Sequence, residues 1–194
     1  SYRLCISFIP IYLTNMYSSG IVILPYHRII KFNGARNIED ILHVLSNYGV
    51  IEGYDLTDSA SMERVMKDIT ESERLAFAFC SKDKPDNIYE FIQKTPVPMD
   101  KDLHEVLKTL KVNVVHKGVI KDILGIADEE ISFTQDYNES LDALKRGSLD
   151  LAIFLPPTTV QEVKDIADNN LVMPPKSTFF YPKILTGLVF YKYA

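Results

Sequence analysis

Two runs of almost uninterrupted apolar residues constrain the fold of this chain most strongly. The first covers residues 75–80 and the second covers residues 149–155, where Pro156 and Pro157 end it. A strand with one wet face alternates apolar and polar residues, whereas a strand buried on both faces stays apolar throughout. The sequence therefore predicts two buried strands and places the first of them at the centre of a sheet.

Apolar residues spaced three and four apart predict helices between the strands. Asn37 is expected to open a helix that Gly49 closes, and Ser59 is expected to cap the next one. A helix over residues 102–110 carries His104 on its polar face. Further helices are predicted over residues 115–124 and 138–146, and another after a cap at Thr158 or Thr159. Further strands are predicted over residues 50–57, 88–93, 131–134 and 184–193.

The start of the chain resembles a hairpin. Residues 4–17 and 21–32 are rich in Ile, Val, Tyr and Phe, and Ser18-Ser19-Gly20 separates them. Pro25 removes one donor from the ladder of hydrogen bonds, so the second run is expected to be an edge strand or to carry a bulge. The first run follows the N-terminal residue almost directly and no Met precedes it, which leads us to expect a C-terminal fragment of a longer protein.

These elements combine into one fold class. Hairpins occupy the first half, and from residue 131 strands alternate with helices. The predicted fold is α/β or α+β, with a mixed, largely antiparallel sheet and helices packed on it. We expect residues 1–194 to form a single domain, with residues 96–98 (Pro-Val-Pro) as the only candidate internal boundary.

Composition excludes several classes of function. The 21 Lys and Arg residues against 26 Asp and Glu give a net charge of −5, which is unfavourable for binding nucleic acid. Cys5 and Cys80 lie far apart in apolar runs, so we expect a reduced, cytoplasmic protein. No apolar stretch reaches the roughly 20 residues of a membrane helix. The scattered His43, His104 and His116 are expected to be structural, and no metal site is predicted.

The irregular segment 173–183 is the first candidate binding site. It holds three prolines together with Lys176, Ser177, Thr178 and Lys183. Proline orders the backbone in advance, and cations beside hydroxyl groups suit a phosphate or carboxylate. The alternative is a proline-rich crossover whose aromatic residues cover the edge of the core.

His27 and Arg28 form the second candidate. Both follow Pro25 on a predicted strand, where alternation places His27 on the face opposite Arg28. An exposed pair of this kind binds a phosphate or moves a proton. The alternative is an edge strand that uses charge against aggregation.

Several strings resemble the bacterial and archaeal domain-of-unknown-function family 1015. Residues 20–28 (GIVILPYHR) match its G-[LI]-x-I-L-P-x-H-R strand, and residues 172–183 (VMPPKSTFFYPK) match its M-P-x-K-S-T-x-F-x-P-K loop. Residues 114–116 with 123–126, and residues 155–158, resemble its middle region. Tyr26 stands where the family commonly has Thr.

The resemblance implies a function for a longer protein. Members of the family carry an upstream half with an Asp-Gly-His-His-Arg motif, similar to ParB/sulfiredoxin-like proteins and to kinases of free serine. The resemblance therefore implies a small-molecule phosphotransferase that uses ATP or ADP with magnesium and needs the upstream half as partner. This chain alone would be inactive, and its ligand contacts would be Lys176, Ser177, Thr178, Lys183, His27 and Arg28. The alternatives are a non-catalytic scaffold or interaction module and, third, a ParB-like DNA-partition factor.

Overall fold

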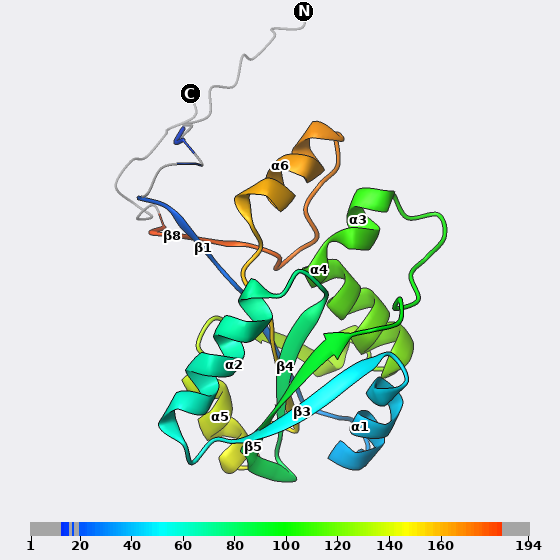
Figure 1. The fold of residues 1–194 in the computed structure, drawn as a ribbon, viewed down its shortest axis with the longest axis vertical. Coiled ribbons are helices and arrows are strands. Elements are labelled where there is room, and N and C mark those ends of the chain that lie inside the picture. Colours follow the sequence, from blue (N-terminus) through cyan, green and yellow to red (C-terminus); the bar gives the residue numbers. More distant parts are fainter. Residues whose placement is uncertain (1–12, 16, 18–19, 184–194) are drawn as a thin grey trace, which may run out of the picture.

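A six-stranded sheet separates two layers of helices (Figure 1). The structure is a computed structural model that describes residues 13–15, 17 and 20–183. All described strand pairs are antiparallel. In spatial order the strands are β3 (Gly49–Asp55), β5 (Lys84–Gln93), β4 (Ala76–Ser81), β7 (Leu151–Phe154), β2 (His27–Ile30) and β6 (Ile131–Thr134). This arrangement confirms the predicted fold class.

Each face of the sheet has its own helices. α1 (Ile38–Ser46), α4 (Lys111–Asn113) and the π-helix η1 (Val114–Ile123) contribute to the core on one face, and α2 (Ser59–Glu71) and α5 (Tyr137–Lys145) to the core on the other. Alternation along β4 sends Phe77 and Phe79 to the first core and Ala76, Ala78 and Cys80 to the second. Because both faces are covered, the central position predicted for β4 is confirmed.

A small second sheet changes the interpretation of Pro25. β1 (Val22–Leu24) pairs with β8 (Phe179–Tyr181), and the chain leaves this pair at Pro25 to enter β2 at His27. β2 lies between β7 and β6, so the predicted edge strand is wrong. The predicted hairpin is not found among the described residues, and most of its first strand, like the strand over 184–193, lies outside them.

Helix ends follow local capping chemistry. The Asn37 side chain accepts a hydrogen bond from the Asp40 N–H, which confirms the predicted cap. Asp58, not Ser59, caps α2. His104 caps α3 (Glu105–Thr109) instead of lying on its polar face. Thr159 and Glu162 form a reciprocal capping box on α6 (Val160–Asp168).

Two glycines permit close packing. α1 ends before Asn47, so Gly49 is not its cap but the first residue of β3, where a Cβ would lie 2.4 Å from the Ile92 carbonyl oxygen. A Cβ on Gly118 of η1 would lie 2.4 Å from Cγ1 of Val97, a residue that is only 7% exposed. Segment 96–98 is therefore packed against η1. Among the described helices, none is long and apolar enough to cross a membrane.

Candidate functional site

Arg28 joins the two segments that the sequence singles out. Its Nη2 donates a hydrogen bond of 3.3 Å to the carbonyl oxygen of Lys176, which lies 148 positions later in the chain. Its Nη1 donates to the carbonyl oxygen of Tyr26. The strand β2 and the loop 173–183 therefore meet in space, but through a main-chain carbonyl and not through the Lys176 amine.

The Arg28 guanidinium is a buried cation without an acidic partner. The residue is 1% exposed, its Nε has no hydrogen-bond partner, and no described carboxylate forms an ion pair with it. Burial lowers the pKa of Arg28 to about 10. The ring of Phe133 on β6 lies under the guanidinium, 5.4 Å from Cζ. Since charged groups are rarely fully buried unless paired, this position is electrostatically incomplete.

His116 belongs to the same cluster. Its Nδ1 is buried without a hydrogen-bond partner, and its ring centroid lies 6.2 Å from that of Phe133. Burial and then the charge of Arg28 lower the pKa of His116. On the solvent side, its Nε2 lies 3.6 Å from Oδ1 of Asp128. Sequence reasoning gave His116 only a structural role, although the string 114–116 that contains it was part of the family resemblance.

His27 lies on the other face of the sheet. It is 1% exposed, packs edge-on against Phe154 and accepts a hydrogen bond of 3.3 Å at Nδ1 from the Leu155 N–H. Burial, followed by the charge of Arg28, lowers the pKa of His27 to about 4, so the imidazole is neutral at pH 7. The opposite faces of His27 and Arg28 agree with the predicted alternation. The predicted exposure of the pair is wrong, because β2 is an interior strand.

Ser177 faces into the protein. Its side chain is 3% exposed, and its hydroxyl donates a hydrogen bond of 2.7 Å to the Pro174 carbonyl. The Ser177 carbonyl in turn accepts one of 2.9 Å from the Thr158 hydroxyl. These bonds give Ser177 a loop-stabilising role in this conformation, and its part as a ligand contact stays a prediction.

Lys176, Thr178 and Lys183 supply the accessible polar groups of the loop. The Lys176 ammonium lies 5.1 Å from the ring centroid of Tyr26, and that of Lys183 lies 4.5 Å from the ring centroid of Phe179. Tyr26, Thr178, Phe179 and Lys183 line part of a hollow of about 370 Å3. Lys183 is the cation that lines this hollow, and Lys176 lies over the ring of Tyr26, which also lines it. A cation, a hydroxyl and aromatic rings around one hollow can hold an anion that carries an apolar or planar group.

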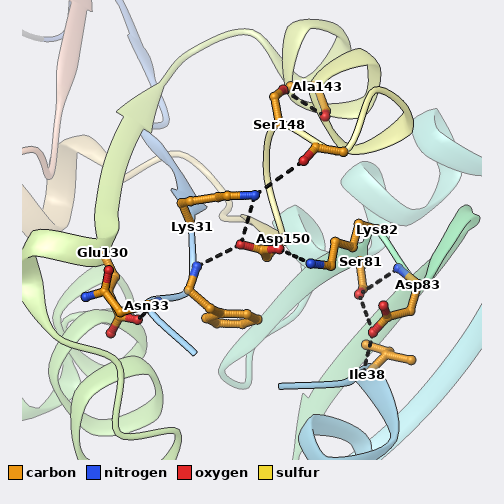
Figure 2. Close-up of polar contacts among 12 residues, drawn as sticks. Lys31, Asn33, Ile38, Ser81, Lys82, Asp83, Glu130, Ala143, Ser148 and Asp150 are labelled. Carbon is orange, nitrogen blue, oxygen red and sulfur yellow. Dashed lines mark hydrogen bonds and ion pairs between the residues drawn. The ribbon is translucent and has the colours of Figure 1, made fainter. Parts of the chain in front are cut away.

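A second buried charge, on Asp150, has a complete set of partners (Figure 2). Asp150 directly precedes β7 and is 3% exposed. Its carboxylate accepts hydrogen bonds from the Lys82 ammonium and from the Phe32 N–H, the latter 2.8 Å long, and Lys31 lies 3.5 Å away. Burial by itself would raise the pKa of Asp150, but these hydrogen bonds and charges together lower it. Asp150 therefore stays ionised as part of the fold.

The described residues offer no metal centre. No group of three or more His, Cys, Asp or Glu side chains within them is placed to hold a metal ion. Around the loop, the donors are ammonium groups and a hydroxyl, whereas Mg²⁺ prefers carboxylate oxygens. Residues 173–183 therefore do not fit a magnesium site.

Comparison with known proteins gives only distant likenesses. No protein-family model matches the chain, and no curated protein matches it. Among solved structures, a conserved hypothetical protein from Pyrococcus furiosus aligns with a TM-score of 0.47 and 15% identity over 86% of this chain and 59% of its own. A free serine kinase variant in complex with AMP aligns with a TM-score of 0.47 and 14% identity, over 86% of this chain and 56% of its own. A free serine kinase variant in complex with ADP aligns with a TM-score of 0.46 and 15% identity, over 86% of this chain and 56% of its own.

The chain thus spans less than three fifths of the length of these structures. At such identities and TM-scores, the likenesses carry no argument about what this chain binds or does. The resemblance to family 1015 stays a prediction from the motif residues.

Proposed function

We propose that this chain forms an anion-binding wall of a phosphotransferase that acts on a small hydroxyl compound such as free serine. ATP or ADP would be the phosphoryl donor, and the upstream half expected from the family resemblance would complete the site. Within this chain, Lys176 and Lys183 would contact the phosphate, Thr178 would donate a hydrogen bond to it, and Arg28 would position the loop.

The hydrogen bond between Arg28 and the Lys176 carbonyl carries this proposal. It ties the strand motif to the loop motif, and the accessible ammonium groups of the loop lie over aromatic rings beside one hollow. Phosphoryl transfer depends mainly on positioning and on stabilising the negative charge spread over the transferred group. Two cations and a hydroxyl on one loop suit that requirement.

The reaction itself would need groups from outside the described residues. The bond from phosphorus to its leaving oxygen breaks while a bond to the substrate hydroxyl oxygen forms, and the hydroxyl proton passes to a base. His27 cannot be that base from the far face of the sheet, where it is neutral and bonded to Leu155. We therefore propose that the base belongs to the upstream half and that this chain alone is inactive.

A specific observation favours a second candidate, a non-catalytic scaffold. The Ser177 hydroxyl and the Arg28 guanidinium both donate to carbonyls of the chain itself. Under this alternative the motif residues hold the loop in shape for a partner surface and bind no ligand.

The decisive experiment uses the protein that carries both the upstream half and this chain. Phosphorylation of free serine by ATP is followed by 31P NMR in the wild type, in Lys176→Ala and in Lys183→Ala. We expect each variant to lose about tenfold in rate or more, the usual effect of removing a charge-assisted hydrogen bond. Arg146→Ala, which removes an exposed cation at the far end of α5, is the matched control and keeps its rate.

Full turnover in both lysine variants would exclude the proposed contacts and favour the scaffold. Absence of phosphoryl transfer from ATP or ADP to serine or any other small hydroxyl compound would exclude the phosphotransferase.

A further inference from the structure

A basic groove is lined by residues next to the start of β4 and the end of β5 and by residues of α3, α4 and η1. Figure 1 labels β4, β5, α3 and α4. The groove shares no lining residue with the loop 173–183. It has a volume of about 570 Å3. Four of its lining residues are cations, namely Arg74, Lys94, Lys108 and Lys111, and the only acidic residue among the described lining is Glu73. This local excess of positive charge stands out in a chain whose net charge is −5.

Two of these cations are held in place by the fold. The Lys111 ammonium donates a hydrogen bond of 2.6 Å to the Ser72 carbonyl at the end of α2. The Lys108 ammonium donates to the Lys101 carbonyl at 2.9 Å and to Oε1 of Glu105 at 2.7 Å. An ammonium has three protons, so each keeps at least one for a ligand. These hydrogen bonds already restrict the two lysine side chains. Binding a ligand therefore costs them less conformational entropy than it would cost a free lysine.

The other two cations have no partner within the described chain. Arg74 and Lys94 are exposed, and neither side chain forms an ion pair or a hydrogen bond with a described residue. They flank the groove from the loop before β4 and from the residue after β5. Cations gathered along a hollow raise the local concentration of anions.

The floor of the groove is apolar. Leu75, Val97 and Val114 line it, and each is only 7% exposed. Inorganic phosphate would leave this floor uncovered, whereas an organic phosphate could place an apolar or aromatic group on it. The volume lies within the range of small-molecule pockets, about 300–1,000 Å3.

We propose that this groove binds an organic polyphosphate, with the phosphates against Arg74, Lys94, Lys108 and Lys111 and an apolar group on the Leu75–Val97–Val114 floor. The site is separate from the loop that holds Lys176 and does not depend on the function proposed for that loop.

The test uses ATP as the probe and isothermal titration calorimetry of the whole chain. We expect ATP to bind the wild type and to bind Arg74→Ala and Lys94→Ala about tenfold more weakly each, because each variant removes a charge-assisted contact. Both side chains are exposed and lack internal bonds, so these variants should fold, which circular dichroism verifies. Arg146→Ala, with the same change of charge, should bind as the wild type does.

Three results would overturn the inference. The first is that ATP does not bind the wild type. The second is that Arg146→Ala weakens binding as much as Lys94→Ala does, or that Lys176→Ala weakens it while Arg74→Ala and Lys94→Ala do not, which would place the nucleotide at the loop. The third is that inorganic triphosphate binds as tightly as ATP, which would leave the apolar floor without a part in recognition.

Discussion

Asp150 and Arg28 are buried charges at neighbouring strands whose surroundings differ in one respect. Asp150 has two lysines and a main-chain N–H directed at its carboxylate. Arg28 has two main-chain carbonyls and an aromatic ring, but no carboxylate and no partner at Nε. At Asp150 the fold supplies the counter-charges, whereas at Arg28 the described residues leave the charge uncompensated.

This difference separates a structural charge from a candidate functional one. Removing one partner of a buried ion pair strongly destabilises a protein. A buried charge without a partner already lowers the stability of the unmutated protein. A position of the second kind is retained most readily where something else, such as a bound anion, completes it.

The largest effect is expected from Asp150→Ala. This change leaves the Phe32 N–H unpaired and removes the counter-charge of Lys82 and Lys31. Because both lysines are about half exposed and stay solvated, we expect the free energy of unfolding at pH 7 to fall by about 3 kcal/mol, measured by urea denaturation. Asp142→Ala, which removes an exposed carboxylate from α5, should change it by less than about 0.5 kcal/mol. Equal losses in the two variants would show that Asp150 is no more than a surface charge.

The second effect is a dependence of stability on pH that comes from His27. Its folded-state pKa of about 4 lies below the ordinary 6.5, so the unfolded chain binds the proton more readily. The stability that the neutral ring contributes is therefore present above pH 6.5 and is lost as the pH falls to about 4, by up to about 3 kcal/mol. His27→Gln keeps an acceptor for the Leu155 N–H but does not titrate.

The measurement is urea denaturation at intervals between pH 4 and pH 7. The slope of unfolding free energy against pH should be smaller in His27→Gln than in the wild type. A residual slope is expected from His116, whose pKa is also lowered. Identical slopes in both proteins would show that His27 is not the buried neutral group described here.

The third prediction concerns Arg28→Met. Methionine keeps much of the apolar volume of the arginine stem and removes the uncompensated charge, so we expect the free energy of unfolding to change by less than about 1 kcal/mol. Because the Arg28 charge lowers the pKa values of His27 and His116, both should rise in the variant, as followed by NMR titration of the imidazole signals. A destabilisation as large as that of Asp150→Ala would remove the contrast between the two charges.

Local sequence patterns predicted what local physics determines. The apolar runs at 75–80 and 149–155 indicated buried strands, because a strand without polar residues has no face for water. Asn37 was predicted to begin a helix because Asn is a favoured N-cap residue, and its side chain accepts a hydrogen bond from the N–H three residues later. The predicted caps at Ser59 and Gly49 are wrong, since neighbouring residues compete for the same capping role.

The environment of the candidate site depends on contacts distant in the sequence. Nothing near His27 and Arg28 shows that β6 and β7, more than 100 residues later, enclose β2. The sequence of the loop identified its cations and hydroxyl groups. It did not show that the Ser177 hydroxyl donates a hydrogen bond to the Pro174 carbonyl. Similarly, the helical position of His116 did not show that Phe133 and Arg28 lie beside it.

The smallest effect should come from the backbone of Lys176, which has a φ of 56°. This left-handed conformation costs a residue with a Cβ about 1 kcal/mol, and glycine adopts it without that cost. Lys176→Gly and Lys176→Ala remove the same charge, but only the alanine keeps the strain. We expect the glycine variant to be the more stable of the two by up to about 1 kcal/mol in urea denaturation. If the alanine variant were equally stable or more so, residue 176 would not be held in the left-handed conformation, and the strain argued for it would be absent.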